Sequence, residues 1–201
     1  GGHAGGDIAS AIIAQGVAQA DRVYDNTDQA TEYVVEALLA ANTKLGETVA
    51  EHPELKGMGT TFSGIVVTGD LVTLIHIGDS RVYMVSDNNV KQVTKDHTFV
   101  QRLVDTGRIT EEEALTHPRR SVLMRVLGDV EISPEVDTEV FKATAGDRWM
   151  LCSDGLTGFV PEDIINEILL NKSVDAEEAT ELLIYEALEH GAPDNVTVVV
   201  V

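Results

Sequence analysis

Short turn signals in the middle of the chain constrain the fold more than any other feature of the sequence. Gly69-Asp70 and Asp87-Asn88-Asn89 are typical turn sequences, and each separates two apolar segments of β type. The four segments span residues 59–67 and 71–77, then 82–85 and 90–94. Connections this short leave no room for a crossover helix, so each pair of segments is predicted to form an antiparallel hairpin.

Helical patterns lie on both sides of these strands. Apolar residues recur at helical spacing over 7–24 and 28–51, and again over 161–170 and 176–190. Further strands are predicted at 132–141, 148–152 and 195–201. This order of helices, strands, helices and a last strand indicates an α+β fold, in which helices cover antiparallel sheets.

Residues 95–128 interrupt the series of strands. Phe99, Leu103 and Val104 suggest a short helix, and Thr110-Glu111-Glu112-Glu113 has the acidic start that is typical of another. We therefore predict an inserted helical lobe at about 95–128. The chain has 201 residues, a length that suits one domain, so a single domain over 1–201 is expected.

The chain is strongly acidic, because 34 Asp and Glu against 14 Lys and Arg give a formal net charge of −20. A general nucleic-acid binder needs a net basic face, so that class is all but excluded, and contact with an anionic membrane surface is disfavoured. No apolar run is long enough to span a membrane, which indicates a soluble domain. Most of the acids are expected on solvated helix faces, which leaves a handful for chemistry.

Cys152 is the single cysteine, so an internal disulfide is impossible and a reducing compartment, the cytoplasm, is expected. It lies within an apolar segment without a basic neighbour, which favours a buried structural thiol over a nucleophile. The six histidines form no short-spaced zinc pair, and His76, in mid-strand, is expected to pack or to support a ligand. The sequence contains neither a phosphate-binding loop ending in Lys-Ser or Lys-Thr nor a nucleophile elbow.

Polar residues interrupt the apolar strands at three strand ends. The three stretches are Gly78-Asp79-Ser80-Arg81, Ser153-Asp154-Gly155 and Ala192-Pro193-Asp194-Asn195. Each alone reads most simply as an ordinary turn, since Asp, Gly, Asn and Pro are turn residues. A carboxylate at a strand end beside Gly or Pro is also exposed and firmly held, as a ligand of magnesium or manganese must be. Together the three stretches favour a metal site with oxygen ligands.

In this order the stretches resemble the metal-dependent serine/threonine protein phosphatases of type 2C, the PPM family, and their actinobacterial members above all. The resemblance covers nearly the whole chain. It includes Gly57-Met58-Gly59-Thr60-Thr61, Gly78-Asp79-Ser80-Arg81, Thr94-Lys95-Asp96-His97, Ser153-Asp154-Gly155 and Asp194-Asn195-Val196-Thr197. The opening Gly1-Gly2-His3-Ala4-Gly5-Gly6 is similar to the end of the family's Asp-Gly-Met-Gly-Gly-His segment.

The resemblance implies an αββα sandwich of two antiparallel sheets flanked by helix pairs, and a site with two or three manganese or magnesium ions. Asp154 and Asp194 match metal-binding Asp residues of the family, and Asp79 matches the Asp that helps to hold a third, weaker ion. By the same resemblance, Ser121 is expected to face a further ion, as in the closest relatives, whereas Asn195 is expected to brace the Asp194 loop. Residues 95–128 correspond to the family's flap.

The chain also departs from the family pattern. The bridging Asp, its neighbouring Gly and the Arg that binds the substrate phosphate would precede Gly1, as would the first strands. No catalytic residue beyond the metal ligands is therefore identifiable within the 201 residues, and a domain incomplete at its N-terminus is expected.

By this resemblance the expected function is metal-dependent hydrolysis of phosphoserine and phosphothreonine in proteins, opposing Ser/Thr kinases in bacterial signalling. The expected partners are phosphorylated proteins, among them Ser/Thr kinases and their substrates. A non-catalytic module of the same fold that binds phosphoproteins or regulates them is the alternative. The location expected is the cytoplasm, either free or as the cytoplasmic domain of a membrane-anchored protein.

Overall fold

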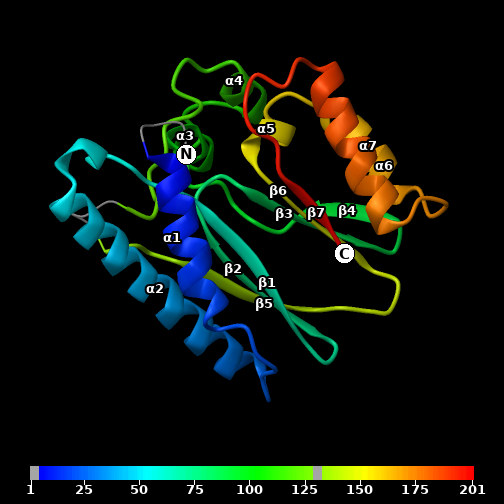
Figure 1. Ribbon diagram of the computed structural model, residues 1–201. Helices are drawn as coiled ribbons and strands as arrows, with labels where there is room; N and C mark the ends of the chain where they lie inside the picture. Colours follow the sequence, from blue (N-terminus) through cyan, green and yellow to red (C-terminus); the bar gives the residue numbers. More distant parts are fainter. Residues whose placement is uncertain (1–4, 129–132) are drawn as a thin grey trace. The chain divides into compact units, whose positions relative to one another are not determined.

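The computed structural model describes residues 5–128 and 133–201, which form two compact units, each made from two separate stretches of chain (Figure 1). The first unit comprises Gly1–Gly78 and His97–Lys142, and the second comprises Asp79–Asp96 and Ala143–Val201. Each unit contains one antiparallel sheet and its own helices, which confirms the α+β class with two antiparallel sheets. The single domain expected over 1–201 stays a prediction.

The sheet of the first unit has the strand order β1-β2-β5. Its strands are β1 (Phe62–Thr68), β2 (Leu71–Ile77) and β5 (Asp137–Lys142). The predicted turn at Gly69-Asp70 joins β1 to β2, and Gly69 has a φ of 64°, which favours glycine. Strand β2 is central and almost wholly buried, so it forms the middle of this unit's core.

Helices α1 (Gly6–Ala18) and α2 (Thr27–Glu51) lie side by side in the first unit (Figure 1), and α2 also contacts β2. Asn26 caps α2 by accepting a hydrogen bond from the Gln29 N–H. The buried face of α2 has helical spacing and packs with Ile75 and Ile77 of β2. Its residues are Ala30, Val34, Leu38, Ala41 and Leu45. A short 3₁₀ helix, η1 (Pro53–Leu55), follows α2.

The stretch predicted as a helical lobe, 95–128, contains α3 (Phe99–Asp105) and α4 (Glu111–Leu115). Thr98 caps α3. Thr110 and Glu113 form a reciprocal capping box at α4, which explains why the acidic stretch begins a helix there. Both predicted helices are therefore present.

The sheet of the second unit has the order β4-β3-β6-β7. Its strands are β3 (Arg81–Ser86), β4 (Asn89–Gln92), β6 (Arg148–Cys152) and β7 (Val198–Val200). Helices α6 (Glu162–Leu170) and α7 (Ala176–Glu189) contact β4 and β7 respectively. Their buried residues form one apolar core with Tyr83, Met150 and Val200 of the sheet.

Four predicted elements differ from the structure by three residues or more at one end. Strand β1 begins at Phe62 rather than at 59. The first helix was expected to reach residue 24 but ends at Ala18, and Tyr24 is instead buried with its hydroxyl bonded to the Ala20 carbonyl. Strand β5 begins at Asp137 rather than at 132, because the Glu135 carbonyl accepts hydrogen bonds from Arg125; residue 132 lies outside the described residues. Strand β7 begins at Val198 rather than at 195, since Thr197 is bonded to Ser153.

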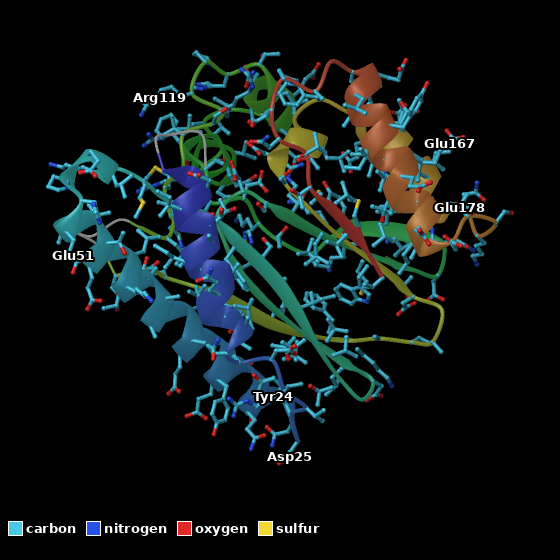
Figure 2. The ribbon with its side chains drawn as sticks, viewed as in Figure 1. Tyr24, Asp25, Glu51, Arg119, Glu167 and Glu178 are labelled. Carbon is cyan, nitrogen blue, oxygen red and sulfur yellow. The ribbon has the colours of Figure 1, made fainter. Side chains whose placement is uncertain are left out.

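Many of the acidic side chains lie on exposed helix faces, as expected. Figure 2 labels Glu51 at the end of α2, Glu167 on α6 and Glu178 on α7, and all three residues are exposed. Within residues 5–128 and 133–201, no helix combines the length and the apolar character needed to cross a membrane.

Candidate metal centre

The register of the second sheet brings the three predicted metal ligands to one end of it. Arg81, the first residue of β3, and Val198, the first residue of β7, both pair with Cys152, the last residue of β6. Asp79 precedes β3, Asp194 precedes β7 and Asp154 follows β6. All three carboxylates therefore extend beyond the same end of three neighbouring strands.

Asp154 is the first residue of a four-residue helix, α5 (Asp154–Thr157), which was not predicted. The loop before β7 is bound to the start of this helix through Ser153. The Ser153 hydroxyl donates to the Asn195 carbonyl at 3.2 Å and accepts from the Thr197 N–H at 3.0 Å. These hydrogen bonds hold the Asp194 loop beside Asp154.

Gly155 permits this close approach. A Cβ atom at Gly155 would lie 2.2 Å from the Asn195 carbonyl oxygen, a distance that no real contact allows. The Asn195 N–H also donates to Asp194 Oδ1 at 2.7 Å. Asn195 thus braces the loop as expected, although it does so through its backbone groups.

The carboxylates are close enough that Asp154 repels both Asp79 and Asp194. Burial and then the Asp154 charge raise the pKa of Asp79 to about 6. Burial and then the Asp194 charge raise the pKa of Asp154, although Asp154 is exposed on its outer side. Negative charges held together in this way are unfavourable by themselves, and a divalent cation between them would remove the repulsion.

This donor set fits magnesium or manganese. Both ions prefer carboxylate oxygens and usually keep several water ligands rather than a closed cage of side chains. Within residues 5–128 and 133–201, no three His, Cys, Asp or Glu side chains lie close enough together to hold a metal ion by themselves. The three Asp residues would hold ions from one side and leave the other side to water or a phosphate.

Three other sequence predictions concern residues outside this set. Ser121 belongs to the first compact unit, where it is exposed, and its role as a ligand stays a prediction. The glycine-rich opening, with His3, lies largely outside the described residues, since these begin at residue 5. Cys152 is a free buried thiol as expected, and burial raises its pKa to about 12.

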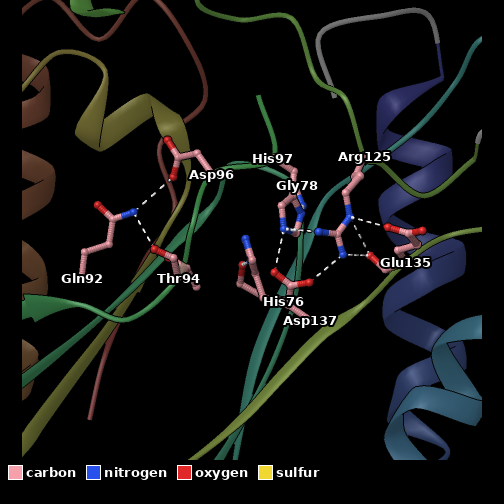
Figure 3. Close-up of polar contacts among 10 residues, drawn as sticks. His76, Gly78, Gln92, Thr94, Asp96, His97, Arg125, Glu135 and Asp137 are labelled. Atoms are coloured by element: carbon pink, nitrogen blue, oxygen red, sulfur yellow. Dashed lines mark hydrogen bonds and ion pairs between the residues drawn. The ribbon is translucent and has the colours of Figure 1, made fainter. Parts of the chain in front are cut away.

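Arg81, two residues after Asp79, has a partner that the sequence does not reveal. Arg81 binds Asp96 through two parallel hydrogen bonds, from Nε to Oδ1 at 2.9 Å and from Nη2 to Oδ2 at 2.7 Å. Figure 3 shows Asp96 also accepting a hydrogen bond from Gln92. Asp96 was noted only as part of a motif, and the contact could not be inferred from residues that are 15 positions apart.

Comparison with known proteins places the chain among phosphatases. Residues 1–190 match the profile of the family described as protein phosphatase 2C. The chain is 44% identical over 200 residues to the serine/threonine protein phosphatase PstP of Mycobacterium tuberculosis, covering all of this chain and 38% of that protein. It is 36% identical to the serine/threonine phosphatase stp of Listeria monocytogenes, covering all of this chain and 80% of that protein.

Solved structures agree with the sequence matches. The crystal structure of the Mycobacterium tuberculosis phosphatase PstP/Ppp has a TM-score of 0.91 at 44% identity, over 100% of this chain and 83% of that one. The catalytic domain of PstP in complex with two manganese ions has a TM-score of 0.86 at 41% identity, over 100% of this chain and 82% of that one. The chain spans well under half of full-length PstP. By its matching profile, its relatives and its fold, the chain belongs to the protein phosphatase 2C family.

Proposed function

We propose that the chain is part of a metal-dependent phosphatase that hydrolyses phosphoserine and phosphothreonine in proteins. The observation that carries this proposal is the set of Asp79, Asp154 and Asp194 at one end of the second sheet, in a chain of the protein phosphatase 2C family. A non-catalytic module would gain nothing from carboxylates that repel one another. In a metal-dependent enzyme, the same carboxylates would bind the catalytic ions.

The three Asp residues would hold manganese or magnesium, as the chemistry of their donor set allows, and Ser121 is proposed as a further ligand. Two manganese ions accompany the related catalytic domain of PstP. When bound, such ions polarise the phosphoryl oxygens and lower the pKa of a water molecule, which lets water attack phosphorus. The chain's own contribution is to hold Asp154 and Asp194 side by side through Ser153, and Asp79 on the turn before β3.

The substrates proposed are phosphorylated proteins, and among them Ser/Thr kinases whose action the enzyme would oppose. Relatives named as serine/threonine phosphatases support the class of substrate. A cytoplasmic location belongs to the same proposal. It is supported by the free, buried Cys152, which suits a reducing compartment.

The test is release of phosphate from a phosphothreonine peptide by the full-length protein, titrated with manganese and stopped by a chelator. We expect Asp154→Asn to lose activity by orders of magnitude while keeping its fold, because a negative ligand is removed. Asp79→Asn should lose less and require more manganese.

Asp87→Asn serves as the matched control, since Asp87 is exposed in the β3-β4 turn with a φ of 50°, which Asn also adopts readily. This variant should keep the activity of the wild type. Equal and negligible losses in all three variants would show that the Asp residues hold no catalytic metal. A wild type that releases no phosphate with manganese present would refute the proposed function.

A further inference from the structure

The turn that carries Asp79 is held from its N-terminal side by His97. The Gly78 N–H donates to His97 Nδ1 at 3.0 Å, and the Gly78 carbonyl accepts from the His97 N–H at 2.8 Å (Figure 3). Gly78 has a φ of 117°, and a Cβ atom there would lie 2.3 Å from the Thr61 side chain, so only glycine fits. Both peptide groups of Gly78, the second of which joins it to Asp79, are therefore held in place.

The His97 ring is itself fixed in orientation. It is buried, its Nε2 lies 2.9 Å from Asp137 Oδ2, and it packs against the His76 ring with centroids 4.7 Å apart. Because Nδ1 accepts from Gly78, the hydrogen-bond network assigns the ring proton to Nε2, which donates it to Asp137. Asp137 also accepts from Arg125 Nη2 at 2.6 Å. Arg125 Nη1 also lies 2.9 Å from Nε2. Because Nε2 carries the ring proton, this contact brings two donor groups together, and the bond of the guanidinium to Asp137 comes from Nη2.

The C-terminal side of the turn is held by Asp96, the residue directly before His97 in the sequence. Arg81, two positions after Asp79, forms its paired hydrogen bonds with Asp96, which directly precedes His97. The Asp96 side chain is only 12% exposed, so this ion pair is largely removed from water. Two successive residues, Asp96 and His97, thus hold the chain before and after Asp79.

Holding the backbone on both sides of Asp79 keeps its carboxylate in a place that is unfavourable for a charged group. Burial and the neighbouring Asp154 both disfavour the charged form of its carboxyl group. On a loosely held turn, the carboxylate would move outward into water and away from Asp154. A backbone held at Gly78 and Arg81 keeps the carboxylate available for a cation at the end of the sheet.

We propose that His97 is a positioning residue, which fixes the Gly78-Asp79 backbone through its Nδ1 atom and thereby sets the affinity of the divalent ion at Asp79. The inference rests on the proposed function, because it assumes that Asp79 is a ligand. His97 touches neither substrate nor ion in this role, and Asp137 with Arg125 serves to orient its ring.

Two substitutions at His97 test the role of Nδ1 separately from that of Nε2. In His97→Asn the amide oxygen occupies the place of Nδ1, so the acceptor for Gly78 is kept, whereas His97→Gln places its amide near Nε2 and loses that acceptor. Manganese binding to each full-length variant is measured from the electron paramagnetic resonance signal of free manganese. We expect His97→Gln to weaken the weakest manganese site about 10-fold, and His97→Asn to bind much as the wild type does.

Activity gives a second readout. The manganese concentration for half-maximal phosphate release should rise in His97→Gln, while the rate at saturating manganese is retained. In an Asp79→Asn background, His97→Gln should cause no further change in manganese dependence, because the ligand on which it acts is gone. His52→Gln, at a histidine whose side chain is 55% exposed in the same unit, is the control and should change nothing.

If His97→Gln lowers thermal stability and rate equally in both backgrounds and leaves manganese binding unchanged, His97 is a core residue only and the inference is wrong. Should His97→Gln fail to fold, Asp137→Ala, at an exposed position, provides the second variant. It frees the ring that holds Gly78, so weaker manganese binding is expected, and unchanged binding would overturn the proposal. A wild type that binds manganese without releasing phosphate would refute the proposed function, but binding would still test His97.

Discussion

At the scale of single residues, the absence of a side chain at Gly155 lets the Asp194 loop approach helix α5 closely. We predict that Gly155→Ala lowers the free energy of unfolding by about 1–3 kcal/mol, because its Cβ would meet the Asn195 carbonyl oxygen at 2.2 Å. Denaturant unfolding measures the loss. Gly64→Ala is the control, since the nearest atoms to its Cβ would belong to the Phe62 side chain rather than to the backbone. Equal effects of both substitutions would contradict a special role for Gly155.

Asp79 gives a second prediction at this scale. Its folded-state pKa is raised to about 6, so it favours folding below its ordinary value of 3.8, and this contribution is lost as the pH rises through about 6. At neutral pH in a chelator, Asp79→Asn should therefore increase stability, on the order of 1 kcal/mol. Thermal unfolding measures the change, and a lower melting temperature of the variant would contradict it. Added manganese should stabilise the wild type more than the variant.

At the scale of elements, strand β5 and the 95–128 stretch are joined by the hydrogen bonds of Asp137 with Arg125 and His97. Burial raises the pKa of Asp137, but these two bonds outweigh it and the net pKa is lowered. The interaction thus contributes stability above the ordinary pKa of 3.8 and loses it as the pH falls through the lower folded value.

Asp137→Asn should accordingly be less stable than the wild type near neutral pH, and the difference should shrink as the pH falls below 3.8. Melting temperatures across this pH range measure the difference. Glu139→Gln, which changes an exposed carboxylate on the same strand, should show no such convergence. A constant gap between Asp137→Asn and the wild type at every pH would exclude the ion pair as its source.

Elements bounded by sharp turn signals could be predicted from the sequence almost to the residue. Strands β2 and β6 have the predicted bounds, and Asp87 and Asn88 adopt the positive φ angles that a tight hairpin requires. Helix α5 could not be predicted, because four residues are too few for a periodic pattern. Its position depends on Ser153 meeting a loop that is more than forty residues away in sequence.

In the candidate site, too, some residues could be predicted from the sequence and others could not. Asp79, Asp154 and Asp194 could be singled out because acids at the ends of apolar strands are conspicuous in a sequence. Nothing marks Asp137 or Arg125 in this way, since their roles depend on a ring nitrogen of His97 that lies 40 and 28 positions away. Contacts between distant segments are a property of the folded chain, and one sequence alone does not contain them.

At the scale of the whole molecule, the net charge of −20 opposes compaction. Raising sodium chloride from about 0.01 M to about 0.1 M shortens the Debye length from about 30 Å to about 10 Å and screens this repulsion. We predict a higher melting temperature at the higher salt concentration, measured in a chelator. Sucrose at the same osmolality screens no charge and is the control. A lower melting temperature in salt would mean that attractive ion pairs outweigh the net repulsion.

The interleaving of the two compact units also has a consequence for how the protein is made. Since each unit combines an early and a late stretch, the ribosome releases the β3-β4 hairpin well before β6, the strand that pairs with β3. The first unit lacks β5 until residue 142 has emerged, and the second lacks β7 until residue 200. The nascent chain therefore carries unpaired strand edges through most of its synthesis, and chaperones that cover such edges would aid its production.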